Sequence, residues 1–124
     1  MTVTTYRQLT VWQQGMELVE SAYRLTHLFP AEERFGLISQ LQRAAVSIPA
    51  NIAEGWGRTH RGDYLRHLSI ARGSLMEVET HLLLAMRQNF VAKEDVKPCW
   101  DQAKQVGKML TAMIASMQQS EPSD

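Results

Sequence analysis

The chain has a single cysteine among its 124 residues, Cys99. An internal disulfide and a zinc site built from several cysteines are therefore excluded. The longest apolar run, Leu82–Met86, is far shorter than the ~18 residues that a membrane span needs. The first residues, Met1–Arg7, lack a basic stretch followed by an apolar one, so no secretory signal is expected. We therefore expect a cytoplasmic protein that does not enter a membrane.

The sequence also lacks an excess of charge of either sign. Thirteen Lys and Arg balance thirteen Asp and Glu, which excludes a protein that is basic over its whole surface but allows a local basic patch. A chain of this length with 44% apolar residues is typical of one globular domain with one core. We predict a single domain over residues 1–124, with its core at about residues 8–119.

No segment alternates with the period of a β-strand, whereas four segments carry a helical period. They run from about residues 11 to 28, 32 to 56, 60 to 88 and 93 to 119. The connections are short, so consecutive helices should be antiparallel. The sequence thus predicts an all-α, up-down-up-down four-helix bundle. The apolar stripes expected to face its core are Leu9, Trp12, Met16, Val19, Tyr23 and Thr26; Ile38, Leu41, Ala45, Ile48, Ile52 and Gly55; Tyr64, Leu68, Ala71, Leu75, Val78, Leu82 and Ala85; and Val96, Cys99, Ala103, Val106, Leu110, Met113 and Met117.

Pro49 interrupts the second segment. Inside a helix, a proline removes one backbone donor and crowds the carbonyl four residues earlier, Ala45. The apolar period nevertheless continues in phase from Ile48 to Ile52, which favours one helix that is kinked at Pro49. Two short helices meeting at this proline are the alternative.

Apolar residues exceed what one core needs. A second set lies beside the core stripes, and several members are Met or Trp, which are common at the centres of interfaces. This excess favours self-association of the chain. The set is Leu18, Leu25, Leu65, Met76, Leu83, Met86, Trp100, Met109 and Ile114.

The common signatures of catalysis and of metal binding are missing. A di-iron bundle needs Glu-x-x-His on two helices, but the nearest pairs, Glu77 and Glu79 with His81, have the wrong spacing and occur once. Cys99 lies on an apolar stripe and is expected to be a buried, inert thiol. Gly55-Trp56-Gly57 is followed by neither a dinucleotide fingerprint nor a Walker motif. We expect no enzyme, no metal, no cofactor and no small-molecule substrate, and we assign no catalytic residue.

A basic cluster marks the start of the third helix. Arg58, His60, Arg61 and Arg66 lie here against a single acid, Asp63, where helix amides also attract phosphate. We predict that these four residues bind nucleic acid. The alternative is a solvated helix end whose arginines pair with neighbouring acids.

Two further interpretations involve residues near this cluster. Arg61 and His67 are spaced loosely like the Arg-x4-6-His motif of RNA-cleaving HEPN domains, which would make His67 a general base. Other polar residues lie on or beside apolar stripes, and a buried unpaired charge is costly. We therefore expect a structural polar network between the second and third helices. Its members are Arg43, Asn51, Glu54, Arg72 and Glu77.

Long stretches of the chain resemble a known family. They are Gln40–Gly55, Tyr64–Thr80 and Val11-Trp12-Gln13. These stretches are similar to the bacterial 23S rRNA intervening-sequence proteins, or S23 family. The resemblance covers about residues 6–118, and the family offers no catalytic residues to transfer.

The resemblance implies a homopentameric ring of four-helix bundles. It also implies a relation to the accessory variability proteins of diversity-generating retroelements, which bind nucleic acid and are strongly basic, unlike this chain. The expected function is therefore a non-enzymatic, homo-oligomeric binding or scaffold protein whose partners are other copies of itself and structured RNA or a ribonucleoprotein. The alternatives are a protein–protein hub without nucleic acid and the HEPN-like ribonuclease.

Overall fold

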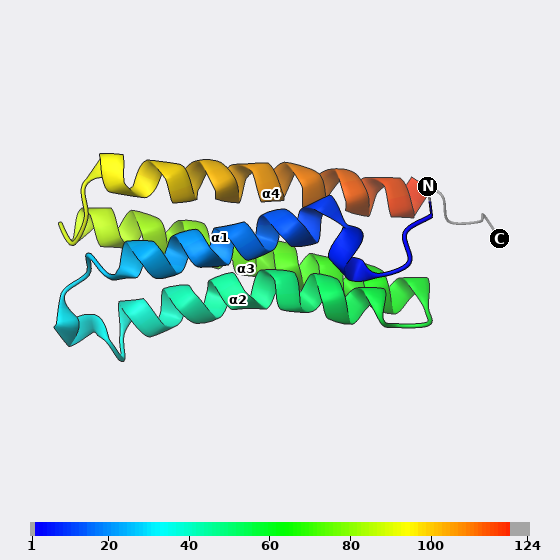
Figure 1. Ribbon diagram of the computed structural model, residues 1–124, viewed down its shortest axis with the longest axis horizontal. Helices are drawn as coiled ribbons and strands as arrows, with labels where there is room; N and C mark the ends of the chain where they lie inside the picture. Colours follow the sequence, from blue (N-terminus) through cyan, green and yellow to red (C-terminus); the bar gives the residue numbers. More distant parts are fainter. Residues whose placement is uncertain (1, 120–124) are drawn as a thin grey trace.

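Four long helices pack side by side in the computed structural model, which describes residues 2–119 (Figure 1). They are α1 (Thr10–Thr26), α2 (Leu37–Trp56), α3 (Arg61–Arg87) and α4 (Lys93–Gln119), with short 3-10 helices η1 (Tyr6–Gln8) and η2 (Ala31–Glu33). Each long helix packs on two neighbours: α1 and α3 both contact α2 and α4. The predicted all-α, up-down-up-down bundle is confirmed, and the described residues contain no strand.

The core runs along the whole bundle and follows the predicted stripes of α2, α3 and α4. Residues seven apart, such as Leu41 and Ile48 or Leu68 and Leu75, are fully buried. This repeat keeps one face of each helix against its neighbours at a shallow crossing angle. The other fully buried large side chains are Leu18, Ile52, Val78, Leu82, Val96, Cys99, Val106 and Leu110.

The predicted stripe of α1 is correct in part: Thr26 is buried, and Leu9, Trp12 and Val19 pack against the core, but two of its positions face solvent. Met16 and Tyr23 are 41% and 42% exposed, whereas Leu18 and Ala22 are fully buried. The buried face also carries Gly15 and Ser21, small residues that a search for large apolar side chains passes over. Small residues let two helices approach closely: a Cβ built on Gly15 lies 3.5 Å from Cβ of Pro49 on α2.

α2 is one helix that passes through Pro49 without a break, so two separate helices meeting there are excluded. It begins later than predicted, because Glu33 belongs to η2 and accepts a hydrogen bond at 3.0 Å from the amide of Leu37. The carboxylate thus satisfies one of the unpaired amides at the start of α2. The segment that precedes this helix is held against it as a result.

Hydrogen bonds fix both ends of the turn between α3 and α4. Asn89 has a positive φ of 61°, and the amides of Phe90 and Asn89 donate to the carbonyls of Ala85 and Met86. This is the Schellman pattern that ends helices. Asp95 then accepts a hydrogen bond at 3.0 Å from the amide of Ala92. The end of α3 and the start of α4 are therefore fixed relative to one another.

Candidate nucleic-acid interface

The four residues predicted to bind nucleic acid lie together at one end of the bundle. Arg58 and His60 belong to the turn between α2 and α3, Arg61 begins α3, and Arg66 lies about one and a half turns further along. All four are exposed. We call this surface, Arg58, His60, Arg61 and Arg66, the cationic end.

The N-terminus of α3 opens onto the cationic end. His60 occupies the N-cap position with an extended backbone (φ −106°, ψ 136°), and no side chain of the described residues caps this helix. A Cβ built on Gly62 would meet nothing within 4 Å. Amides at the start of a helix carry partial positive charge and bind anions. The backbone therefore adds to the attraction of the side chains.

Two of the arginines also have contacts within the protein. Arg58 lies 3.5 Å from Glu54, and both side chains are about half exposed. Such a solvated pair contributes little to stability, so a phosphate group can compete for the guanidinium. Arg61 donates a hydrogen bond at 3.3 Å to the carbonyl of Met117, which ties the start of α3 to the end of α4.

One further cation at this end was not predicted from the sequence. Arg7 lies in η1, which contacts α2 and lies beside the turn into α3 in Figure 1. Its side chain is exposed. No local pattern connects Arg7 with residues about fifty positions later in the chain, because only the fold brings η1 to this end.

The two aromatic residues beside the cationic end pack on each other. The rings of Trp56 and Tyr64 meet edge to face, 6.4 Å apart at 89°. Burial raises the pKa of Tyr64, and its hydroxyl has no hydrogen-bond partner in the described part of the chain. This pair therefore packs beside the turn between α2 and α3, with Trp56 half-buried.

His67 points inward and joins a chain of polar side chains along the contact between α2 and α3, which we call the α2–α3 seam. Its Nδ1 lies 3.0 Å from Oδ1 of Asn51 and 3.4 Å from a carboxylate oxygen of Glu54. The amide nitrogen of Asn51 donates to the carbonyl of Ser47 at 2.8 Å and to its hydroxyl at 3.0 Å. This fixes Oδ1 of Asn51 as the acceptor, so Nδ1 of His67 carries the proton. The hydroxyls of Ser47 and Ser74 complete the chain at 2.8 Å.

The predicted polar network between α2 and α3 therefore exists with different members. Asn51 and Glu54 belong to it, but Arg43, Arg72 and Glu77 do not take part in its bonds. Arg43, Arg72 and Glu77 are all exposed, so the predicted burial of these charges is wrong.

Arg72 shows the physical reason for this correction. It follows Ala71 by one position, a rotation of about 100° around the helix, which carries it off the buried stripe. Its long charged side chain therefore stays in water. The sequence pattern suggests a catalytic base at His67, not a member of the polar network. It gives no sign of Ser47 or Ser74, because their short side chains belong to no apolar stripe.

The geometry does not bring together the pair that a HEPN-like ribonuclease needs. The side chain of His67 is only 5% exposed and faces the α2–α3 seam, whereas Arg61 reaches toward the end of α4. Within residues 2–119, no group of three or more His, Cys, Asp or Glu side chains is arranged to hold a metal ion. No helix in this part of the chain is long and apolar enough to cross a membrane.

Comparison with known proteins shows the family to which the chain belongs. Residues 7–112 match the sequence profile described as 23S rRNA-intervening sequence protein. The chain belongs to this family. No curated protein matches it. A crystal structure of a protein of unknown function from the S23 ribosomal protein family of Bacteroides thetaiotaomicron superposes with a TM-score of 0.76 at 24% identity, covering 85% of this chain and 98% of that one.

The two longest stretches that resemble the 23S rRNA-intervening sequence proteins lie in α2 and α3. Gln40–Gly55 lies within α2 and Tyr64–Thr80 within α3, and these two helices share the most extensive contact in the described part of the molecule. The polar chain of the α2–α3 seam falls within the same two stretches. Much of the family resemblance is therefore carried by residues that fix this pair of helices, and of the cationic end only Arg66 falls within the two stretches.

Proposed function

We propose that this protein is a non-enzymatic, self-associating bundle of the cytoplasm that binds structured RNA through its cationic end. The single observation that carries the proposal is the gathering of Arg58, His60, Arg61 and Arg66 around the N-terminus of α3, which no described side chain caps. Arginine side chains and helix amides are the groups that most often contact phosphate oxygens in proteins that bind nucleic acids. Arg7 adds a further cation at the same end.

Self-association is the second half of the proposal. The chain has no net charge, and one copy of so small a cationic surface would bind RNA weakly. In a homo-oligomer, for which the family resemblance implies a pentamer, the surface is repeated, and several modest contacts to one RNA raise the overall affinity through effective concentration. A structured RNA or a ribonucleoprotein offers many phosphates to such a repeated surface.

Fluorescence anisotropy tests the RNA half. The purified protein is titrated into a labelled structured RNA and, separately, a labelled duplex DNA at several salt concentrations. We expect saturable binding whose logarithm falls linearly with the logarithm of salt concentration, with a slope of roughly 0.7 to 0.9 per phosphate neutralised. Binding that does not change with salt would contradict an interface made of phosphate contacts.

Paired variants locate the interface. Arg58→Gln with Arg66→Gln should weaken binding and reduce the salt slope by about one for each arginine that touches a phosphate. The matched control is Arg24→Gln with Arg87→Gln, since both of these arginines are exposed and lie at the opposite end of the bundle, in the last turns of α1 and α3. If both double variants bind RNA equally, the cationic end is not the site. If the unmodified protein binds no RNA even at low salt, the alternative of a protein–protein assembly without nucleic acid remains.

A further inference from the structure

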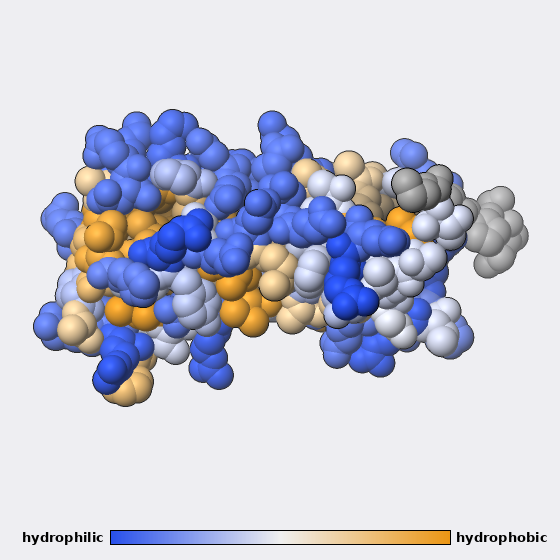
Figure 2. All heavy atoms as spheres, viewed as in Figure 1, coloured by the Kyte–Doolittle hydropathy of each residue, from blue (hydrophilic) through white to orange (hydrophobic). Residues whose placement is uncertain are grey.

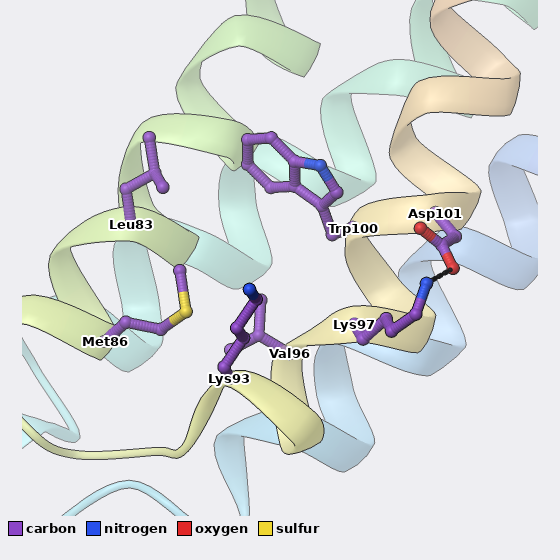
Figure 3. Close-up of a pocket in the computed structure, with 7 residues that line it drawn as sticks. All are labelled: Leu83, Met86, Lys93, Val96, Lys97, Trp100 and Asp101. Carbon is purple, nitrogen blue, oxygen red and sulfur yellow. Dashed lines mark hydrogen bonds and ion pairs between the residues drawn. The ribbon is translucent and has the colours of Figure 1, made fainter.

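A groove of about 350 Å³ lies between α3 and α4, at the end opposite the cationic end (Figure 3). Leu83 and Met86 of α3 form one wall, and Val96 and Trp100 of α4 form the other. Leu83 is 44% exposed, so its apolar surface faces solvent in an isolated copy. The closed turn between α3 and α4 holds both walls in place. We call this surface the α3–α4 groove.

Two lysines, Lys93 and Lys97, line the α3–α4 groove, and Lys104 lies beside its Trp100. Lys97 is paired with Asp101 at 2.8 Å, and Lys104 lies 3.6 Å from Glu79 and 5.0 Å from the centre of the Trp100 ring. Lys93 also lines the groove and, in Figure 3, rises between Met86 and Trp100. No ion pair of Lys93 is found within the described residues. The groove therefore suits an apolar group that has a carboxylate beside it.

The chain carries such a group on another face. Phe35 is 89% exposed, the largest exposed fraction of any large apolar side chain described. Tyr23 of α1 and Val46 of α2, each more than two-fifths exposed, line the same surface hollow as Phe35. Glu32 lies three residues before Phe35 and is exposed. Because Glu33 is bonded to the start of α2, the segment of residues 32–35, which we call the Phe35 segment, is held in a fixed position.

The two surfaces are placed for contact between copies. The hollow beside Phe35 lies between α1 and α2, and the groove lies between α3 and α4, so they occupy opposite faces of the bundle. Both are at the same end, where η2 and the α3–α4 turn lie in Figure 1. Two different patches at one level on opposite faces join copies head to tail, with their long axes side by side. Repetition of such a contact gives a ring where the rotation between neighbouring copies closes, and an open filament where it does not.

We propose that the α3–α4 groove of one copy receives Phe35 of the next, with Glu32 facing Lys93. This inference rests on the self-association half of the proposed function and is independent of RNA binding. An exposed aromatic ring and an apolar groove gain by excluding water from each other. The carboxylate of Glu32 and the ammonium of Lys93 set the orientation of the contact.

Sedimentation velocity over a concentration series tests the contact. Phe35→Ala should raise the dissociation constant roughly 30-fold or more, as truncation of a central aromatic anchor does, and Leu83→Lys should also prevent assembly. The matched controls are Leu28→Ala, an exposed leucine at the same end, and Leu84→Lys, the exposed neighbour of Leu83. Both controls should assemble like the unmodified protein. Circular dichroism should show that all four variants keep their helices.

A mixing experiment separates this contact from any other. A Phe35→Ala copy keeps an intact groove, and a Leu83→Lys copy keeps an intact Phe35. An equimolar mixture therefore forms one good junction and should sediment as a two-copy complex, heavier than either variant alone. A mixture that sediments as the sum of its components overturns the inference.

Further outcomes distinguish the two proposals. If the unmodified protein assembles and Phe35→Ala assembles equally well, the contact is wrong while self-association stands. If the unmodified protein is a monomer at every concentration, both are wrong, and RNA binding is still tested by the salt titration.

Discussion

At the scale of single residues, the α2–α3 seam gives partners to most of its polar groups, although Nε2 of His67 is buried without one in the described part of the chain. His67 is buried, and its Nδ1–H is satisfied by Asn51, whose own amide is satisfied by Ser47. Each hydrogen bond adds only about 1 kcal/mol to stability, but a buried group that loses its partner costs more than that. The chain of partners therefore matters more than any one of its bonds.

Asn51→Ala should destabilise the protein by about 1–3 kcal/mol. The substitution leaves Nδ1–H of His67 with only the longer contact to Glu54 and removes a partner of the Ser47 hydroxyl, and the cost of such unpaired buried groups sets the magnitude. Urea unfolding followed by circular dichroism measures it. Arg72→Ala is the control, because this side chain is exposed and its loss should change the free energy of unfolding by less than about 0.5 kcal/mol. Equal effects of the two substitutions would show that the seam is not a connected unit.

Cys99 should be nearly inert in the folded protein. Burial raises the pKa of its thiol to about 11, against the opposing effects of a Ser21 hydrogen bond and the charge of Arg24. Relative to an ordinary value of 9.0, the fraction of reactive thiolate at pH 8 falls about a hundredfold. Reaction with an aromatic disulfide reagent should therefore be slow and should keep accelerating with pH beyond 9. Rapid labelling at pH 8 without denaturant would show that the thiol is accessible.

The same shift has a consequence for stability. A thiol whose pKa is raised by folding favours the folded state less as pH rises from its unfolded value of about 9 through its folded value of about 11. The contribution of Cys99 to stability is therefore complete below pH 9 and is lost in strongly alkaline solution. Cys99→Ser would change this dependence, since serine does not titrate there.

Among the candidate binding residues, prediction from the sequence succeeded where the relevant neighbours are close along the chain. Arg58, His60, Arg61 and Arg66 fall within nine positions, so their gathering at one end followed from the helix boundary alone. Asn51 and Glu54 were predicted as members of the polar network, but their pairing with His67 and the position of Arg7 join distant segments that no local spacing connects.

At the scale of helices, the pattern of large apolar residues predicted three stripes correctly and the stripe of α1 only in part, since Met16 and Tyr23 are exposed. The buried face of α1 contains Gly15, Ser21 and Ala22 beside larger side chains such as Leu18, so it contributes close approach to α2 as well as apolar volume. The same kind of contact occurs at the start of α3, where Gly55 of α2 lies under His67 and Tyr64. Small residues between helices are thus the feature that hydropathy alone does not reveal.

Gly55→Ala should therefore destabilise the bundle, although alanine is the better helix former. A Cβ at this position lies 2.9 Å from Cβ of His67 and from Cδ1 of Tyr64, so α2 and α3 have to move apart at a cost of about 1–3 kcal/mol. Gly73→Ala is the matched control, because a Cβ there meets nothing within 4 Å. That variant should gain about 0.5–1 kcal/mol from the reduced entropy of its unfolded chain.

Thermal unfolding of the two glycine variants gives the comparison directly. The melting temperature of Gly55→Ala should fall and that of Gly73→Ala should rise. Opposite signs identify close packing as the reason for glycine at position 55. Two variants that both gain stability would mean that the seam has room for a methyl group and that the helices are not held as close as the structure shows.

At the scale of the whole molecule, the bundle has two different ends. In the view of Figure 2, apolar side chains gather over the half that holds η2 and the start of α4, and the end with the α2–α3 turn is mostly polar. The Phe35 segment and the α3–α4 groove belong to the first end and the cationic end to the second. The two proposals, self-association and RNA binding, thus use separate surfaces, and an assembled ring would leave every cationic end accessible on one side.

Because self-association stabilises the folded state, the melting temperature should depend on protein concentration. Substitutions at the cationic end should leave this dependence unchanged. A partner that binds only the folded state stabilises it by mass action, and a tenfold change in concentration corresponds to about 1.4 kcal/mol per contact. For a domain of this size, a hundredfold dilution should lower the melting temperature by several degrees. Phe35→Ala should remove this dependence, whereas Arg58→Gln with Arg66→Gln should retain it. If the melting temperature of the unmodified protein is constant over that dilution, assembly does not stabilise the folded state. Phe35 would then be in contact with water in the folded and in the unfolded protein alike.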